Sequence, residues 1–175
     1  LLGGTLPGNM VVSGTFNTAA TLPGSLTLLN GAKVTWSGGS IQGPVNVAAG
    51  AKLSITGSPI KYLWGSLVNA GTVTWSGTGN LEVDYSSVNN QFGLIQNLPG
   101  AFWDLQGSAR ILNAAPNGAY FQNAGELQKS ADTGGTIISI PFSNTGTVTV
   151  QQGTLTFNGS AMIEGAFMAA GGTIS

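Results

Sequence analysis

The chain of 175 residues contains no cysteine and no histidine. The lack of cysteine excludes disulfides, thiol nucleophiles and zinc fingers. The lack of histidine excludes the Ser-His-Asp triad and, with cysteine also missing, the usual transition-metal sites. The chemistry that remains is that of carboxylates, lysines and hard cations such as calcium. We therefore expect that the protein is not an enzyme.

Charged side chains are also scarce. They make up 6% of the chain, whereas about 25% is typical of soluble domains. The formal net charge is −1 and the five basic residues are scattered, so the sequence offers no electrostatic attraction for nucleic acid or anionic lipid. No apolar run approaches the roughly 18 residues that a membrane span needs. We expect neither nucleic-acid binding nor membrane insertion.

Glycine, in contrast, is abundant, with 28 residues. Gly and Pro interrupt the chain too often for long helices, and the apolar residues recur at every second position. Thr72–Trp75, Thr147–Val150 and Thr154–Phe157 alternate β-branched polar residues with large apolar residues, a pattern that is typical of strands. Composition and periodicity together predict an all-β fold.

The sequence also repeats itself at a short spacing. GAKVTWSG begins at Gly31, and GAKLSITG begins 19 residues later at Gly50. A glycine ahead of a strand recurs along the chain and is followed by an apolar residue. These apolar residues form a first series of Val34, Leu53, Val73, Phe102, Leu127, Val148 and Ile174. A second series consists of Ile41, Ile60, Leu81, Ile111 and Ile137.

The spacing between successive residues lengthens at the same points in both apolar series, and this covariation indicates a solenoid. Each coil of a solenoid buries its apolar residues only against the coils above and below, so its faces must keep step. We predict a right-handed parallel β-helix with about 19–29 residues per coil, the hand following from the strong preference of parallel crossovers. Trp36, Ile55 and Trp75 should stack in one inward column. The residues expected to face outward beside them are Lys33, Thr35, Lys52, Ser54, Thr72 and Thr74.

Asparagine and glycine recur where the coils should turn. Asn30, Asn69, Asn123 and Asn144 each precede a glycine by one or two positions. These residue types tolerate a positive φ, so we expect them to form the corners of the coil.

A second repeat is longer than one coil. Residues Thr35 to Gly50 align without a gap on residues Thr156 to Gly171, an offset of 121. We expect residues 1–175 to form a single β-helix segment of a longer repetitive protein, with a super-repeat of about 121 residues that restarts near residue 154.

Several phrases of the chain resemble the repeats of a known class of proteins. VTWSGGSI, VAAGAKLSITG, LVNAGTVTWSGTGNL, FQNAGELQKSADTGG and FSNTGTVTVQQGTLTF are similar to repeat units of very large exported bacterial β-solenoid proteins, which are adhesin-like and distantly similar to autotransporter passenger repeats. The resemblance covers nearly the whole chain from Thr35 onward. It implies an extracellular or cell-surface location and a scaffold or adhesive role, and it supplies no catalytic residues. The stretch from Asp84 to Pro99 departs from the pattern and leaves room for a local site.

One pair of carboxylates is a candidate site. Glu82 and Asp84 in LEVDY share a strand face, with roughly 7 Å between their Cα atoms. Two carboxylates at such a spacing can bind calcium or serve glycoside hydrolysis. Alternation also explains them as solvated residues, because Leu81 and Val83 would face inward.

The other charged candidates have weaker support. Asp104 with Arg110 would form a surface ion pair or serve a polysaccharide lyase. Lys129 lies next to Ser130, but adjacent residues of a strand point to opposite faces, which argues against a catalytic dyad.

Aromatic residues outside the predicted column suggest a sugar-binding surface, because exposed rings stack on sugars. Two of them share a strand face in PIKYLWG, and the others lie in or near the enlarged coil. The candidate glycan-binding residues are Tyr62, Trp64, Tyr85, Trp103 and Tyr120. In the alternative interpretation, Ile60, Tyr62 and Trp64 all face inward and Lys61 faces outward.

These features predict a non-catalytic structural or adhesive β-solenoid segment of a bacterial surface or secreted protein. The alternative is a carbohydrate-binding or polysaccharide-degrading β-helix. Threonine rows would also suit ice binding, but Lys33 and Lys52 interrupt them. The expected partners are glycans or neighbouring solenoid segments, and the protein would be a monomer or associate end to end. We expect no cofactor, other than calcium at Glu82 and Asp84.

Overall fold

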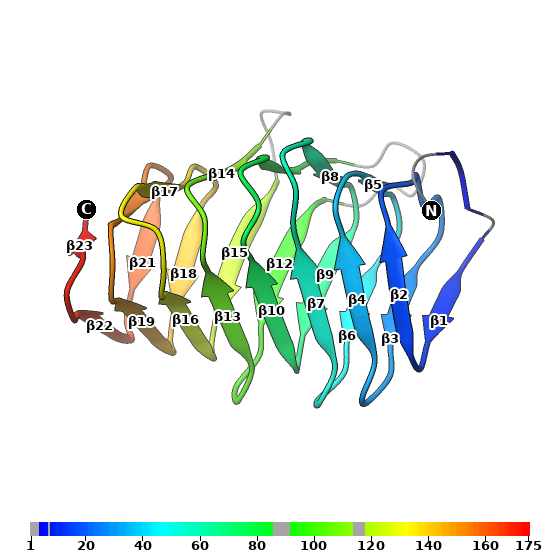
Figure 1. Ribbon diagram of the computed structural model, residues 1–175. Helices are drawn as coiled ribbons and strands as arrows, with labels where there is room; N and C mark the ends of the chain where they lie inside the picture. Colours follow the sequence, from blue (N-terminus) through cyan, green and yellow to red (C-terminus); the bar gives the residue numbers. More distant parts are fainter. Residues whose placement is uncertain (1–3, 7, 86–91, 114–117) are drawn as a thin grey trace.

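The fold is a parallel β-helix. The computed structural model describes residues 4–6, 8–85, 92–113 and 118–175. These residues form 23 β-strands, and none of them belongs to a helix. In this described part of the chain there is accordingly no helix long and apolar enough to cross a membrane. The chain winds around one axis about eight times and contributes a strand to each of three sheets as it goes (Figure 1).

Every strand pairing within the three sheets is parallel. Sheet 1 contains β1 (Met10–Val12), β3 (Leu26–Leu28), β6 (Val45–Val47), β9 (Ser66–Asn69), β12 (Leu94–Asn97), β15 (Tyr120–Asn123), β18 (Phe142–Asn144) and β21 (Ala161–Ile163). Sheet 2 contains β2 (Thr15–Thr18), β4 (Lys33–Trp36), β7 (Lys52–Ile55), β10 (Thr72–Trp75), β13 (Phe102–Leu105), β16 (Glu126–Lys129), β19 (Thr147–Val150) and β22 (Ala166–Ala169). Sheet 3 contains β5 (Gly39–Ile41), β8 (Lys61–Leu63), β11 (Leu81–Val83), β14 (Arg110–Leu112), β17 (Gly135–Ile138), β20 (Thr154–Phe157) and β23 (Thr173–Ile174).

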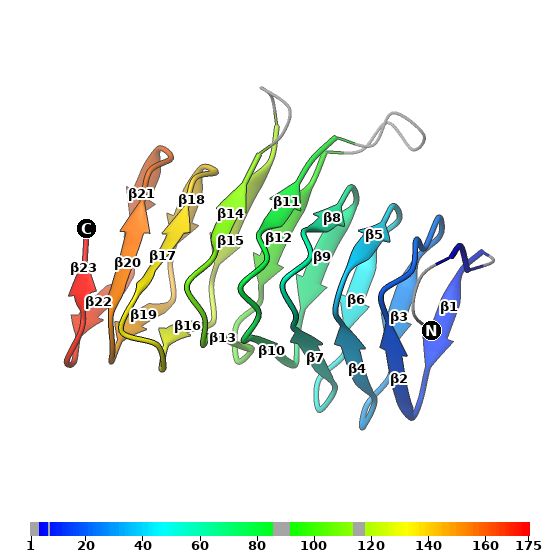
Figure 2. The same ribbon diagram turned by 45° about the horizontal axis from the view of Figure 1, so that its top comes forward.

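The coil is right-handed, as predicted. In Figure 1 the strands of sheet 2 lie in front and run upward, and the chain then passes over the top into sheet 3 and descends behind through sheet 1. Each circuit advances from the N-terminal end toward the C-terminal end. Figure 2, tilted to bring the top forward, shows sheet 3 closing the coil between the other two sheets.

The predicted inward column is confirmed by the register of sheet 2. Ile55 pairs with Trp36 on one side and with Trp75 on the other. All three side chains are buried, with 2% or less of their surface exposed. Rows of aliphatic and aromatic side chains from the three sheets fill the interior in this way, so the coils bury their apolar residues only against one another.

The first apolar series is correct for most coils and wrong for two. Val73 pairs with Trp103, not with Phe102, and Val148 pairs with Phe167, not with Ile174. Phe102 is half-buried, and Ile174 belongs to sheet 3. Paired residues of sheet 2 are 18 to 30 residues apart along the chain, and the longest coil joins β10 to β13.

The second apolar series is wrong at Ile41, at Ile60 and at Ile137. Ile41 pairs with Leu63, whose partner in the following coil is Val83 and not Leu81. Leu81 pairs with Lys61 in the preceding coil, and Ile111 pairs with Ile138 in the following one. Ile60 is 38% exposed, whereas Lys61 is completely buried. The physical reason is a hydrogen bond that holds the lysine inside the coil, as described below.

The corners between sheets 1 and 2 are of two kinds. At three corners the chain makes a four-residue turn closed by a backbone hydrogen bond, such as Ala32 N to Leu29 O at 2.9 Å. The third residue of each turn is a glycine with φ of 77° to 82°, at Gly31, Gly50 and Gly100. This geometry is that of a type II turn, which requires a positive φ at its third residue and therefore favours glycine there.

At the other corners, the asparagines do not adopt the positive φ that we expected. Asp132 is the only described residue other than glycine that does so. Asn69, Asn123 and Asn144 instead end strands of sheet 1 with their side chains buried. The glycine that follows is required for close approach, because a Cβ atom on Gly146 would overlap the carbonyl oxygen of Gly125.

The segments that align at an offset of 121 residues occupy different places in the coil. Thr35 and Trp36 belong to β4 of sheet 2, whereas Thr156 and Phe157 belong to β20 of sheet 3. An offset of this length therefore does not correspond to a whole number of coils here.

Candidate functional site

The paired carboxylates lie on the outer surface of sheet 3. Leu81 and Val83 are completely buried, so Glu82 between them faces outward. Register places Glu82 between Tyr62 of β8 and Leu112 of β14. Asp84 follows the strand, and its Oδ1 accepts a hydrogen bond from the backbone N–H of Tyr85 at 2.6 Å.

Among the described residues, no third acidic side chain joins Glu82 and Asp84 to hold a metal ion. No group of three or more His, Cys, Asp or Glu side chains that could hold a metal ion occurs within residues 4–6, 8–85, 92–113 and 118–175. Calcium binding by Glu82 and Asp84 stays a prediction.

Asp104 and Arg110 are not brought together on one surface. Asp104 lies on sheet 2 and is 6% exposed, while Arg110 is an exposed residue of sheet 3. The Nε2 group of Gln106 donates to Oδ2 of Asp104 at 2.7 Å. The other carboxylate oxygen of Asp104 is buried without a hydrogen-bond partner in the described structure.

Two lysines lie inside the coil, which the sequence reasoning missed. The Nζ group of Lys61 donates to the carbonyl oxygen of Gly57 at 2.8 Å. The Nζ group of Lys129 donates to the carbonyl oxygens of Gly107 at 3.3 Å and Ala131 at 3.1 Å. Both side chains are completely buried. The ammonium of Lys129 is thus engaged inside the coil, so it forms no dyad with Ser130.

The carbonyl groups that accept these bonds, those of Gly57, Gly107 and Ala131, all lie at the corner between sheets 2 and 3. The indole Nε1 of Trp36 donates to the carbonyl of Gly38 at the equivalent corner, at 2.7 Å. Backbone carbonyls that point into the coil need donors there, because a buried acceptor without one costs free energy. The buried lysines and this tryptophan supply them.

Burial lowers the pKa of both lysines below the ordinary value. For Lys61, removal of the ammonium from water is the cause. For Lys129, the same effect dominates, and the negative charges of Asp132 and Asp104 act on its pKa in the opposite direction. Strand alternation alone could not have revealed that Lys61 and Lys129 are buried, because it is read on the assumption that charged side chains face the solvent.

The five predicted glycan-binding aromatics separate into three groups. The prediction for Trp103 is wrong, because its side chain is completely buried and cannot stack on a sugar. Its ring packs on Phe121 at 5.1 Å, and Phe121 in turn contacts Phe142 at 5.5 Å. Phe102 and Trp103 are adjacent, so only one of them can face inward, and the register with Val73 selects Trp103.

Tyr62 and Trp64 form the second group, on sheet 3. Both are half-buried and line a shallow hollow of about 300 Å³ with Thr21, Gly39 and Ser40. The alternative that placed Ile60, Tyr62 and Trp64 inward with Lys61 outward is therefore wrong.

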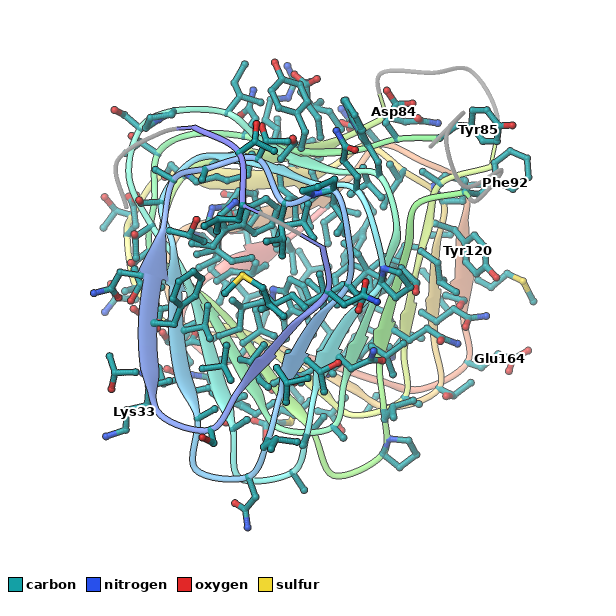
Figure 3. All side chains as sticks on the ribbon, turned by 90° about the vertical axis from the view of Figure 1, so that its right-hand side faces the viewer. Lys33, Asp84, Tyr85, Phe92, Tyr120 and Glu164 are labelled. Atoms are coloured by element: carbon teal, nitrogen blue, oxygen red, sulfur yellow. The ribbon has the colours of Figure 1, made fainter. Side chains whose placement is uncertain are left out.

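Tyr85 and Tyr120 form the third group, together with a residue that the sequence reasoning did not select. The ring of Phe92 lies 5.2 Å from that of Tyr85, at an interplanar angle of 46°. Phe92 is 52% exposed and Tyr120 is 38% exposed. Figure 3 looks along the coil from its N-terminal end and shows these three side chains projecting outward from one side, away from Lys33. The signal for Phe92 was its place in the irregular stretch 84–99, where Tyr85 is the other aromatic residue; residues 86–91 lie outside the described residues.

Phe92 and Tyr120 separate two hollows on the outer surface of sheet 1. The larger has a volume of about 570 Å³, and its lining includes Gln122, Ser143, Ser160 and Met162. The smaller has a volume of about 320 Å³ and adds Ser66 and Leu94. We call the two together the sheet 1 groove. The exposed aromatic rings of Phe92 and Tyr120 line it, and it is therefore the candidate binding site.

No protein-family model, curated protein or solved structure matches the chain.

Proposed function

We propose that the chain is a non-catalytic spacer with an adhesive surface, a segment of a secreted or surface-exposed bacterial protein. The resemblance of its repeats to exported β-solenoid proteins supports the location and the bacterial origin. The single observation that carries the spacer role is the unbroken parallel register of sheets 1 and 2, each of which runs through eight strands. Seven strand intervals at about 4.8 Å give a stiff body of about 34 Å.

The interior accounts for the stiffness. Side chains from all three sheets pack in continuous rows, and the buried asparagines and lysines bond to one another or to backbone carbonyls. Packing of this kind transmits strain and resists bending, because interiors have few voids. A bent or frayed coil would have to break many backbone ladders at once.

The spacer role can be tested by distance measurements between spin labels. The chain contains no cysteine, so Thr15→Cys and Ala166→Cys introduce the only two thiols. Both residues are exposed and lie at equivalent positions of β2 and β22, the end strands of sheet 2. We expect a single narrow distribution that corresponds to about 34 Å between the Cα atoms.

A second pair calibrates the measurement. Thr15→Cys with Glu126→Cys spans five strand intervals, or about 24 Å. The two distances should scale with the number of intervals. A broad distribution for the longer pair would contradict the stiff spacer.

The location requires a separate experiment. Cells that naturally produce the chain should be treated with protease while intact and probed with antibody against it. We expect loss of the signal without lysis, with a cytoplasmic protein as an internal control. Protection until the cells are lysed would overturn the surface assignment.

Carbohydrate binding is the second candidate function, and the sheet 1 groove favours it. Polysaccharide degradation has less support, because Glu82 lies beside Tyr62 on sheet 3 rather than in the groove on sheet 1. Reducing-sugar and unsaturated-product assays separate the two. Turnover that Glu82→Gln abolishes would contradict the non-catalytic proposal.

A further inference from the structure

We propose that the sheet 1 groove binds a linear, uncharged glycan that runs along the axis of the coil. The proposal deepens the adhesive part of the proposed function and rests on it. Three of the large apolar side chains exposed on the described surface, Phe92, Tyr120 and Met162, line the larger hollow together. Scattered apolar residues on a surface are ordinary, whereas a cluster in a hollow marks an interaction site.

The shape of the groove fits an extended chain. Its lining residues come from β9, β12, β15, β18 and β21, or from residues directly beside these strands. These are consecutive strands of sheet 1, so the groove crosses them and follows the axis. Four strand intervals correspond to a length of about 19 Å. A ligand of this length makes several successive contacts, one for each coil.

The chemistry of the lining fits sugars. Pyranose rings present a C–H face that packs on aromatic rings and a rim of hydroxyls that bond to amides and hydroxyls. Phe92 and Tyr120 offer the rings, and the ring of Tyr85 packs against that of Phe92 with 5.2 Å between the centroids. Gln122 accepts a hydrogen bond from Gln96 at 2.9 Å through its Oε1 atom, which fixes the amide and leaves its Nε2 group without a partner among the described residues.

The charge of the lining selects an uncharged ligand. None of the described residues that line either hollow is charged. An acidic polysaccharide would bury its carboxylates or sulfates here without a cation to pair with them, and this costs free energy. The lining hydroxyls of Ser66, Ser143 and Ser160 instead match neutral hydroxyl groups.

An extended peptide is a poorer fit. Peptides that bind to sheets usually add as a strand at an open edge, where main-chain groups are free. The central strands under the groove, β12, β15 and β18, are each paired on both sides. Their backbone groups are therefore committed to the ladder, and the groove can offer only side chains.

Titration calorimetry with soluble neutral hexasaccharides tests the proposal. The panel consists of glucose, mannose, xylose and N-acetylglucosamine oligomers, with oligogalacturonate as the charged comparison. We expect at least one neutral oligomer to bind with a Kd tighter than about 1 mM. Tyr120→Ala and Phe92→Ala should each weaken that binding at least about tenfold, and Tyr120→Phe should retain it because the ring remains.

Phe102→Ala is the matched control, since Phe102 is a half-buried aromatic residue on the outer face of sheet 2 and lines neither hollow of the groove. It should leave the affinity unchanged. Failure of every neutral oligomer to bind, binding of the charged oligomer alone, or equal losses in Phe102→Ala and Tyr120→Ala would each overturn the proposal. The spin-label distance between residues 15 and 166, measured in the Tyr120→Ala background, distinguishes failure of the groove from failure of the spacer.

Discussion

The side chain of Asn97 donates a hydrogen bond from Nδ2 to Oδ1 of Asn123 at 2.8 Å, inside the coil. The same bond joins Asn69 to Asn97 at 2.8 Å and Asn123 to Asn144 at 2.7 Å. All four side chains are buried, with 1% or less of their surface exposed. Each amide also donates to a backbone carbonyl of the next coil, as Asn97 does to Glu126 at 3.0 Å. The ladder therefore locks the register of four successive coils at the corner between sheets 1 and 2.

Asn97→Leu tests the ladder at an interior rung. The change leaves the carbonyl of Glu126, the amide N–H of Asn69 and the Oδ1 atom of Asn123 each without one partner. We expect the free energy of unfolding to fall by about 3 kcal/mol or more, since each buried polar group that loses its partner costs about 1 to 3 kcal/mol. Urea denaturation measures the change.

The control for this prediction is Asn46→Leu. Asn46 lies on the outer, exposed face of β6 in the same sheet, and a surface substitution there should change stability by about 0.5 kcal/mol or less. Equal effects of the two substitutions would show that the ladder does not stabilise the coil.

Ile55→Ala tests the packing of the inward column. Ile55 lies between Trp36 and Trp75 and is completely buried. Truncation leaves a cavity between two tryptophans, and we expect a loss of about 2 to 5 kcal/mol in the free energy of unfolding. Ser54→Ala, on the outer face of the same strand, is the control. A loss below about 1 kcal/mol for Ile55→Ala would indicate that the coils collapse onto the vacant space.

Strand alternation was sufficient to predict the fold and the inward column of sheet 2. It failed where a buried side chain donates a hydrogen bond to a backbone carbonyl. Trp36, Ile55 and Trp75 follow the rule that apolar residues face inward. Lys61 breaks it because the corner at Gly57 presents a carbonyl to the interior, and an ammonium on a long stem can reach it. The sequence cannot reveal which carbonyls turn inward, so it could not place the lysine.

The candidate groove was only partly predictable for a related reason. Tyr85 and Tyr120 were selected as exposed aromatics, but Trp103 was selected with them. Whether an aromatic residue faces in or out depends on the register of a coil with its neighbours, and the coil of Trp103 is the longest, so its register was the hardest to count. Phe92 joins the site because the fold places it beside Tyr120, where both residues line the two hollows.

At the Asn-x-Gly corners, we predict that glycine is needed because successive coils approach each other closely there. Alanine substitutions test this prediction. A Cβ on Gly146 would overlap the backbone of the preceding coil, so Gly146→Ala should cost about 2 to 3 kcal/mol of stability by forcing the coils apart. Gly100 has a φ of 80° and open space around it, so Gly100→Ala should cost only the backbone strain of about 1 kcal/mol.

Gly135 provides the reference for both glycines. It has neither a positive φ nor a neighbour within 4 Å of an added Cβ, so Gly135→Ala should change stability by about 0.5 kcal/mol or less. In thermal or urea unfolding, the loss of stability should therefore be largest for Gly146→Ala, smaller for Gly100→Ala and smallest for Gly135→Ala. A cost for Gly135→Ala as large as that for Gly146→Ala would contradict the role assigned to close approach.

The buried lysines predict a dependence of stability on alkaline pH. Burial lowers the pKa of Lys61 from its ordinary value of 10.5. Between the folded-state pKa and 10.5, the unfolded chain holds a proton on this amine that the folded chain has released. The unfolded state then binds more protons, so the free energy of unfolding rises with pH through this window. Below the window both states are charged, and the cost of burying the ammonium is present in full.

Lys61→Met isolates this effect, because methionine keeps most of the length of the side chain and removes the titrating group. In urea unfolding from neutral pH up to 10.5, the variant should show a smaller rise in stability with pH than the parent chain. Lys52→Met is the control, since Lys52 is exposed on the outer face of sheet 2, and it should leave the slope unchanged. Lys129→Met should act in the same direction, because burial outweighs the opposing effect of the charges of Asp132 and Asp104 on the pKa of Lys129. Identical slopes in the parent chain and in Lys61→Met would mean that the ammonium of Lys61 stays hydrated in the folded protein.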